Sequence, residues 1–350
     1  MRVLVTGGAG FIGAHVVEQL LDDGHDVLVV DALLPSAHEG VPEGLPVGAT
    51  YRYDDLTEPG VAADAVAGVD AVCHQASMVG LGVDFGDVEQ YVRHNDLATA
   101  ALLRALHDRQ FTGRFVLASS MVVYGEGRYR CAHHGAVPAA PRPLARLDAG
   151  HYEVRCPHCD ANATWEPVGE DAPTDPRTVY AATKLHQEHL VAAYEREHPG
   201  ASAVALRYHN VYGPGMPRDT PYAGVASIFR SALARGEAPL VFEDGGQTRD
   251  FVHVRDVARA NVLALSSPGA HGPLNVASGT PTTVLQMAQA LAGALLGPAP
   301  IVVGGARPGD VRHIVASPER AAREIGFRAD IAFTDGIAEL AKAPLRRGTG

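Results

Sequence analysis

The sequence predicts an α/β fold: a parallel sheet covered by helices on both faces, a smaller α/β domain toward the C-terminus, and a Cys/His-rich insertion. Short apolar runs alternate with segments of helical periodicity through the first 210 residues, which is typical of βαβ units. A Gly-rich turn joins the first run to the first helical segment. The alternation breaks once, between residues 128 and 170, and becomes irregular after residue 211.

The individual elements follow from these patterns. Continuous apolar or β-branched runs predict buried strands at 3–6, 27–31, 71–74, 115–119 and 203–208. Helical periodicity predicts helices at 11–23, 95–108 and 179–197. Pro199 and Gly200 end the last helix. We expect the tail 346–350 to be frayed.

Composition excludes some classes of partner. The 350-residue chain has 40 acidic and 29 basic residues and a net charge of −11, without a run of Lys or Arg to bind phosphate backbones or anionic lipids. It also has no uninterrupted apolar stretch of about 18 residues. We therefore expect no nucleic-acid partner, no membrane partner and a cytoplasmic location.

Three glycines indicate a dinucleotide site. Gly7, Gly10 and Gly13 follow the first predicted strand and open the first helix, where glycines allow a tight turn and a close approach to a pyrophosphate. Asp31 ends the second strand about 20 residues on, where a carboxylate can accept both ribose hydroxyls and would repel a 2′-phosphate. This pattern predicts NAD rather than NADP. The alternatives are an ordinary strand-to-helix turn, and for Asp31 a helix cap.

Tyr180 and Lys184 form a candidate catalytic pair. They lie four residues apart on one predicted helix, so their side chains are neighbours. An ammonium beside a phenol favours the phenolate, so we expect Lys184 to lower the pKa of Tyr180. Without the glycine motif, a solvated helix face would explain the same pair.

Together with these motifs, the chain resembles the extended short-chain dehydrogenase/reductase family, in particular its NAD-dependent sugar-nucleotide epimerase/dehydratase branch. The resemblance covers nearly the whole chain outside the insertion. The matching segments are 6–13, Asp31, 55–56, 74–76, Asn95, 119–120, 123–125, the Tyr180/Lys184 pair, 207–214, 249–254 and 307–310.

The resemblance implies catalytic roles for Ser120, Tyr180 and Lys184: Ser120 would bond the reacting hydroxyl, Tyr180 exchange its proton, and Lys184 hold the nicotinamide ribose. The residues implied to contact NAD are Gly7, Gly10, Phe11, Ile12, Gly13, Asp31, Ala32, Leu33, Asp55, Leu56, Gln75, Ala76, Ser77, Asn95, Ser119, Tyr180, Lys184, Tyr208, Asn210 and Val211. Those implied to contact substrate are Met78, Val79, Ser120, Met121, Val122, Asn210, Phe242, Arg249, Arg307 and Asp310.

Three of these residues, Asn210, Arg249 and Arg307, fall where the family binds the substrate diphosphate, and Arg suits that role because its donors fork onto phosphate oxygens. A structural ion pair or cap is the alternative for each. We accordingly expect residues 1–210 to form a Rossmann-type NAD-binding domain with a doubly wound parallel sheet, interrupted by insertion 128–170. Residues 211–345 would form mainly the substrate domain, with some segments returning to the first.

The choice of reaction depends on the two residues after Ser120. Family members that dehydrate sugars have an acid pair there, whereas this chain has Met121 and Val122, which cannot carry a proton. The segment 78–83 offers no cation for a hexuronate carboxylate, and its apolar side chains suit the methyl group of a 6-deoxy sugar; packing beneath the cofactor is the alternative.

We therefore expect 4-epimerisation with retained NAD, by oxidation at C4, rotation of the keto sugar and return of the hydride. Within the branch, segments 119–127, 210–214 and 219–225 and the insertion look most like dTDP-L-rhamnose 4-epimerases, which implies a dTDP-6-deoxyhexose substrate. The alternatives are a UDP-glucose or UDP-glucuronate 4-epimerase, a one-way nucleotide-sugar reductase or dehydrogenase, and a catalytically idle NAD-sensing protein. The resemblance also suggests a homodimer packed through the helices that begin near Asn95 and Val179.

The insertion contains two Cys/His pairs. Cys131 and His134 form one, and Cys156 and Cys159 the other, in a Cys-Pro-x-Cys knuckle; four N/S ligands would close a structural zinc site. His133 and His158 are substitutes for His134, and a loop with free thiols is the alternative. As a hypothesis, the stiffened insertion forms a lid or a partner surface.

Overall fold

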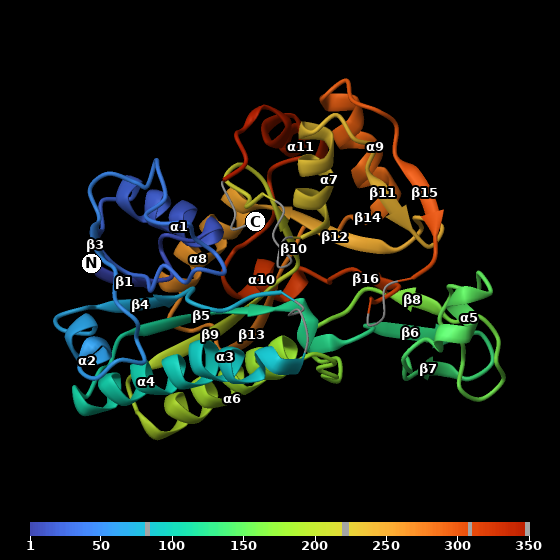
Figure 1. Cartoon of the computed structure of the whole chain (residues 1–350). Helices are drawn as coiled ribbons and strands as arrows, with labels where there is room; N and C mark the ends of the chain where they lie inside the picture. The colour runs from blue at the N-terminus through green and yellow to red at the C-terminus, as the bar shows by residue number, and fades with distance from the viewer. Residues whose placement is uncertain (81–84, 219–223, 307–309, 347–350) are drawn as a thin grey trace.

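The computed structural model describes residues 1–80, 85–218, 224–306 and 310–346. In this part of the chain, the main layer is a sheet of seven strands in which every neighbouring pair is parallel (Figure 1). In order across the sheet, the strands are β13 (Gly272–Val276), β9 (Ser202–Tyr208), β5 (Arg114–Ser120), β4 (Ala71–His74), β1 (Arg2–Thr6), β2 (Asp26–Val30) and β3 (Thr50–Arg52). The predicted fold class is confirmed.

Both faces of this sheet are covered because alternate residues of each strand point to opposite sides. In β1, Val3 and Val5 pack with α1 (Phe11–Asp22) and α8 (Val254–Leu265), whereas Leu4 packs on the other side with α4 (Ala98–Asp108). The helices on the second face are α2 (Val61–Ala65), α4 and α6 (Val179–Glu197) (Figure 1). The predicted helix 179–197 has the same bounds as α6.

The helix expected at 95–108 begins earlier and is irregular. The chain runs without a break through a 3₁₀ turn η1 (Phe85–Asp87), α3 (Val88–Tyr91), a π-helical turn η2 (Val92–Leu97) and then α4. A π turn inserts an extra residue per turn and is frequent at functional sites. It places the Asn95 side chain inside the protein, where Asn95 is 0% exposed.

The C-terminal half builds a second lobe and also extends the first. Strands β10 (Asn210–Tyr212), β12 (Thr248–His253), β14 (Pro281–Thr283) and β16 (His313–Ile314) form one small sheet, and β11 (Leu240–Phe242) pairs with β15 (Ile301–Gly304). Helices α7 (Val225–Ala234), α9 (Val284–Ala294) and α11 (Phe333–Lys342) cover them around a core that contains Phe229, Met287 and Leu340. By contrast, β13, α8 and α10 (Glu319–Glu324) return to the main sheet.

The 128–170 segment projects beyond the end of the main sheet (Figure 1). It contains an antiparallel three-stranded sheet of β6 (Arg128–Cys131), β7 (Gly135–Val137) and β8 (Thr164–Glu166), and the short helix α5 (Leu144–Asp148). Between it and the main sheet, η3 (Met121–Tyr124) follows β5 directly.

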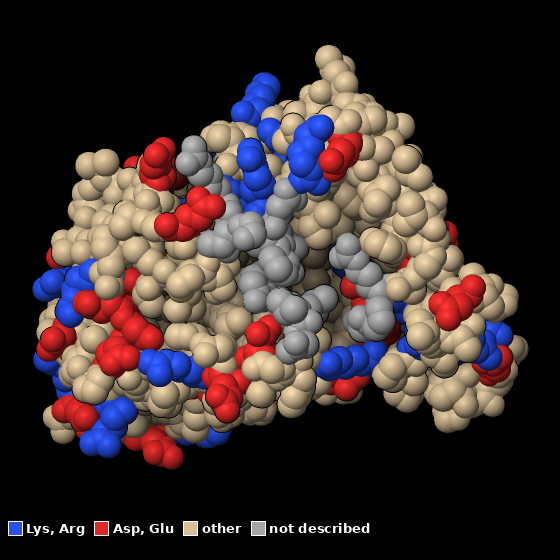
Figure 2. All heavy atoms as spheres, in the orientation of Figure 1, with Lys and Arg blue, Asp and Glu red and all other residues tan. Residues whose placement is uncertain are grey.

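The surface carries both signs of charge. Acidic and basic side chains are interspersed over the face drawn in Figure 2, and this face is hollowed near its centre, between the main sheet layer and the second lobe. Among the described residues, no helix is both long enough and apolar enough to cross a membrane.

Candidate active site

The glycine loop after β1 has no room for side chains. Gly7 has φ +68°, and a Cβ there would lie 2.6 Å from the backbone nitrogen of Ala76. A Cβ at Gly13 would lie 2.1 Å from the carbonyl oxygen of Gly7. Gly10 is the N-cap of α1 and supplies no side-chain cap, so backbone N–H groups at this helix end remain available to an anion.

Most of the residues expected to contact NAD line one cavity that starts at this loop. Those that line it are Gly7, Gly10, Phe11, Ile12, Gly13, Asp31, Ala32, Asp55, Leu56, Gln75, Ala76, Ser77, Ser119, Tyr180, Lys184, Tyr208, Asn210 and Val211. Leu33 and Asn95 do not line it; the Leu33 N–H donates to Asp31 Oδ1 at 2.9 Å, and Asn95 is buried behind the wall.

The Asp31 carboxylate is held by backbone donors. Its Oδ2 accepts the Ala9 N–H at 2.9 Å, while Oδ1 accepts from Leu33 and lies 3.8 Å from His38 Nε2. Burial lowers the pKa of His38, and the Asp31 charge acts in the opposite direction. The cavity wall therefore presents an acidic group at the position expected for ribose hydroxyls, with His38 beside it.

Several cavity residues were not predicted. They include His38, Asp54, His94, Met216 and Arg346. Arg346 contradicts the expected frayed tail, because its N–H donates to Met216 O at 3.0 Å and its carbonyl accepts the Arg218 N–H at 2.8 Å. No local motif marks these residues, since each comes from a different segment. Residues 347–350 lie outside the described residues.

Tyr180 and Lys184 face the cavity from the first turns of α6. The helix starts at Val179 because the Thr178 hydroxyl accepts the Ala181 N–H at 3.1 Å and caps it. Lys184 Nζ donates to Ala118 O at 2.8 Å and lies 5.9 Å from the centroid of the Tyr180 ring. Ser120, at the end of β5, lines the same cavity.

Burial dominates the protonation of this pair. It raises the pKa of Tyr180 to about 12, although the side-chain hydrogen bond with Ser120 acts in the opposite direction. It lowers the pKa of Lys184 to about 7, against the attraction of Asp96 and Glu188. Burial thus outweighs the lowering expected from Lys184, and the pKa of Tyr180 lies above its usual value.

The residues expected to contact substrate divide into two sets. Met78, Val79, Ser120, Met121 and Asn210 line the cavity. The Asn210 Oδ1 is buried and has no hydrogen-bond partner among the described residues, so the cavity offers an acceptor for a ligand.

The other set does not line the cavity and contains Val122, Phe242, Arg249 and Asp310. Arg307 lies outside the described residues. Arg249 is 8% exposed, and its guanidinium donates to the carbonyls of Thr248, Val311 and Arg312 at 3.0, 2.7 and 3.0 Å. Burial lowers the pKa of Arg249, while Asp310 opposes that shift.

The insertion brings Cys131, His134, Cys156 and Cys159, which we call the Cys/His cluster, within 4.8 Å of one another. The Cys131 and Cys159 Sγ atoms are 3.7 Å apart, and His134 Nδ1 lies 3.6 Å from the Sγ atoms of Cys131 and Cys156. With bonds of about 2.3 Å to sulfur and 2.0 Å to nitrogen, a tetrahedral zinc site has ligand separations of roughly 3.5–3.8 Å. The three separations above lie in this range, so the cluster could hold a metal ion, with His134 rather than His133 or His158 as its histidine.

Comparison with known proteins identifies the family to which these motifs belong. A sequence profile described as "NAD dependent epimerase/dehydratase family" matches residues 3–143 and 158–277. The unmatched residues between these two ranges belong to the insertion. The matched ranges include the glycine loop, Ser120, and the Tyr180/Lys184 pair.

Individual relatives extend over nearly the full chain. A dTDP-L-rhamnose 4-epimerase from Burkholderia thailandensis is 34% identical over 97% of this chain and 93% of its own length. A putative UDP-glucose 4-epimerase from Methanocaldococcus jannaschii is 29% identical over 96% of this chain and 95% of its own. The crystal structure of the Thermus thermophilus UDP-glucose 4-epimerase with NAD is 31% identical, with a TM-score of 0.76 and coverage of 97% and 98% of the two chains. By its sequence, its sheet order and its nearly full-length match to these enzymes, the chain belongs to the NAD-dependent epimerase/dehydratase family.

Proposed function

We propose that this protein is an NAD-dependent nucleotide-sugar 4-epimerase. The proposal is carried by one observation: Ser120, Tyr180 and Lys184 all line the cavity that begins at the glycine loop. A hydroxyl, a phenol and an amine would then surround the reacting carbon, next to a site shaped for a dinucleotide.

The residues present fit NAD. The side-chain-free loop at Gly7 and Gly13 leaves room for a pyrophosphate at the N-terminus of α1, and Asp31 offers oxygens to ribose hydroxyls. Bound NAD would supply reversible acceptance of a hydride from C4 of the sugar. Contacts with the glycine loop and with Asp31 would keep the cofactor bound between turnovers.

The side chains of this protein would transfer the proton of the C4 hydroxyl. Tyr180 would exchange a proton with the C4 hydroxyl at its phenol oxygen, and Ser120 would orient that hydroxyl. With a pKa of about 7, Lys184 can change its charge near neutral pH and so bias the phenol toward releasing or holding its proton. Met121 faces the cavity without an ionisable group, which disfavours elimination of water and supports epimerisation over dehydration.

The proposal also specifies the substrate sugar. We infer a dTDP-6-deoxyhexose such as dTDP-L-rhamnose, because Met78 and Val79 form an apolar stretch of the wall that suits a methyl group at C6. The Tyr91 hydroxyl donates to the carbonyls of Val79 and Gly80 at 3.3 and 3.1 Å and so supports that stretch from behind. Since relatives named for UDP-glucose match this chain over a similar length, UDP-sugars are the second candidates.

Proton NMR tests the reaction and the substrate together. Purified protein is incubated with dTDP-L-rhamnose, UDP-glucose or UDP-glucuronate without added cofactor, and we expect the C4-inverted product from dTDP-L-rhamnose. Absence of inversion of all three by protein shown to contain NAD would refute the proposal. Net formation or loss of NADH would instead indicate a one-way dehydrogenase or reductase.

A variant links the reaction to the cavity. Tyr180→Phe removes only the phenol oxygen, so we expect kcat to fall by roughly 10²–10⁴-fold while the bound NAD is retained. Tyr53→Phe, at a side chain that is 43% exposed, is the matched control and should react like the wild type.

We further propose that the Cys/His cluster holds a structural zinc ion. Its four N/S groups and their separations support this, and the Cys131–Cys159 distance of 3.7 Å is much longer than the roughly 2.05 Å of a disulfide. Because four protein ligands leave no open position, the ion would stabilise the insertion and take no part in the reaction.

Assembly as a homodimer is also proposed. Val92 and Leu97 of η2 are 45% and 50% exposed, and they line a shallow depression of the surface. His186 of α6 pairs with Asp96 of η2 at 3.1 Å, so the two helical segments share one face. Light scattering coupled to gel filtration measures the mass; a monomer at micromolar concentration would contradict the proposal.

A further inference from the structure

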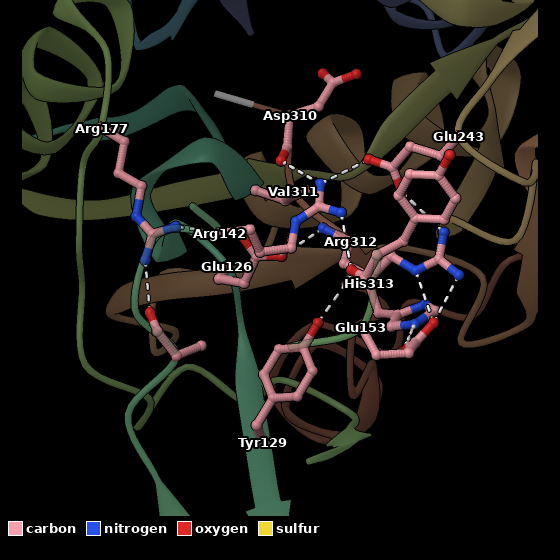
Figure 3. A network of polar contacts seen from close by, with 12 residues as sticks. Glu126, Tyr129, Arg142, Glu153, Arg177, Glu243, Asp310, Val311, Arg312 and His313 are labelled. Carbon is pink, nitrogen blue, oxygen red and sulfur yellow. Dashed lines mark hydrogen bonds and ion pairs between the residues drawn. The ribbon is translucent and has the colours of Figure 1, made fainter. Parts of the chain in front are cut away.

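Side chains of the insertion contact the segment 310–313 (Figure 3). This segment in turn accepts hydrogen bonds from Arg249. Arg142 Nη2 donates to the carbonyl of Asp310 at 2.8 Å. Glu153 accepts from Arg312 Nε and Nη2 at 2.9 and 2.6 Å, and its other oxygen lies 3.1 Å from His313 Nε2. Two insertion side chains thus reach three of these four consecutive residues.

The contacts belong to one network of charged side chains, which we call the Arg312 network: Glu126, Arg142, Glu153, Glu243 and Arg312. The Glu153 side chain is 37% exposed and the other four are buried. Arg312 is 3% exposed and also bonds Glu243 Oε2 at 2.9 Å, and Arg142 bonds Glu243 Oε1 at 2.8 Å. Glu126 accepts the Arg312 N–H and lies 3.1 Å from Arg177 Nη1. Arg312 also pairs with both carboxylate oxygens of Asp244, at 2.7 and 3.0 Å, so Glu153 is one of three carboxylates that hold Arg312 in place.

On its other side, the segment touches Arg249. The carbonyls of Val311 and Arg312 accept from its guanidinium, and the His313–Ile314 strand pairs with β12, which carries Arg249. Within the described residues, the three guanidinium hydrogen bonds of Arg249 go to carbonyl oxygens, so in those bonds its positive charge meets backbone dipoles and not a carboxylate. Arg249 lies two residues before Phe251, which pairs with the cavity residue Asn210.

The contacting residues stand on the same short segments as the Cys/His cluster. Tyr129 accepts the His313 N–H at 3.2 Å and lies two residues before Cys131 in β6, and Glu153 lies three residues before Cys156. The insertion has a small hydrophobic cluster of six buried residues, two of them cysteines of the Cys/His cluster. A core of this size needs a metal or a similar constraint to keep one conformation.

No described residue of the insertion lines the cavity itself, so a lid does not follow from this arrangement. We propose that Arg142 and Glu153 are positioning residues of the nucleotide-sugar site, which set Arg249 through the segment 310–313, and that metal in the Cys/His cluster keeps them in place. The inference rests on the proposed function and on the expectation, implied by the family resemblance, that Arg249 binds the diphosphate of that substrate.

The test measures nucleotide binding and turnover separately in the NAD-containing protein. Titration calorimetry with dTDP and with UDP gives a Kd that needs no sugar chemistry. For Glu153→Ala we expect the Kd of the nucleotide that binds wild type, and the KM of its sugar, to rise at least tenfold. Bound NAD should stay unchanged and kcat at saturating substrate should change less than threefold. Glu153→Gln keeps one acceptor for Arg312 and should lose less.

Glu166→Ala is the matched control. Glu166 is similarly half-buried and also pairs with an arginine of the insertion, Arg130 in β6, but its ion pair does not involve the segment 310–313. The Kd of this variant should equal that of the wild type. Chelation of the metal in wild-type protein should weaken nucleotide binding as Glu153→Ala does, and added zinc should restore it.

The outcomes separate the positioning role from the proposed function. Wild-type affinity in folded Glu153→Ala and Glu153→Gln would overturn the positioning role while leaving the proposed function intact. A loss of kcat and NAD together with the Kd effect would also overturn it, since that pattern means general damage to the fold. Wild-type protein that binds neither dTDP nor UDP would refute the proposed function, and the inference with it.

Discussion

Asn95 Nδ2 donates to the Thr183 hydroxyl at 2.9 Å and thereby joins the π turn η2 to the helix that carries Tyr180. The same amide group accepts the Met78 N–H at 2.7 Å and donates to the Met78 carbonyl at 3.0 Å. Thr183 in turn donates to the Tyr180 carbonyl at 2.9 Å. One buried amide thus connects the apolar wall of the cavity to the helix that carries Tyr180 and Lys184.

Asn95→Ala should therefore damage both stability and activity. The substitution leaves the buried polar groups of Met78 and Thr183 without their partner, at a cost of about 2–4 kcal/mol in the free energy of unfolding. We also expect kcat/KM to fall at least tenfold. Urea unfolding and initial rates measure the two effects. Gln90→Ala, at an exposed residue of α3, is the control; equal stability of the two variants would contradict the role of Asn95.

Gly13→Ala should abolish cofactor binding. The new Cβ would lie 2.1 Å from the Gly7 carbonyl oxygen, so the loop must move away from the helix end. We expect little or no NAD in the purified protein and a loss of about 3 kcal/mol or more in stability. Gly293→Ala is the control: it lies within α9 with nothing within 4 Å of a Cβ, and should gain about 0.5–1 kcal/mol. Normal NAD content of Gly13→Ala would refute the loop geometry.

Metal analysis checks the zinc proposal. Wild-type protein should contain about one zinc ion per chain. Cys156→Ser should lose most of it and become sensitive to limited proteolysis between residues 128 and 170, because the ion holds the small insertion core together. Cys73→Ala, in β4 of the main sheet, should retain the ion. Equal zinc content in Cys156→Ser and wild type would exclude Cys156 as a ligand.

Stability should fall as the pH falls below about 6.5, in part because of His74. Its ring nitrogens contact the hydroxyls of Thr6 at 2.6 Å and Thr99 at 2.9 Å, and burial, aided by Lys184, lowers its pKa to about 3. Between pH 6.5 and 3 the unfolded chain binds a proton there that the folded chain does not. Each such proton lowers the free energy of unfolding by up to about 1.4 kcal/mol per pH unit as the pH decreases.

His74→Gln should remove the contribution of His74 to the pH dependence of the free energy of unfolding. Urea midpoints at pH 7, 6 and 5 give the dependence, and the variant should show a shallower fall than the wild type. His151→Gln, at an exposed histidine of the insertion, is expected to keep the wild-type slope. Parallel curves for His74→Gln and wild type would rule out His74 as a source of the pH dependence.

The sequence was sufficient to predict those elements that depend on residues close together in the chain. Helix 179–197 could be predicted to the residue because Thr178 caps its start and Pro199 and Gly200 end its pattern. The glycine loop could be predicted because Gly7 and Gly13 occupy positions where a Cβ would overlap backbone atoms. The spacing of Tyr180 and Lys184 likewise puts them on one helix face before any tertiary contact forms.

Tertiary structure alone decided the features that depend on distant segments. Strand β13 joins the main sheet beside β9, and Arg346 lines the cavity, although neither segment carries a local signal for its neighbour. Burial, which reverses the expected pKa shift of Tyr180, is a property of the folded surroundings. Arg249 and Arg312 have the same side chain, but only their packing makes one a donor to carbonyls and the other the centre of an ion network, because any arginine can pair with whichever acceptors the fold brings to it.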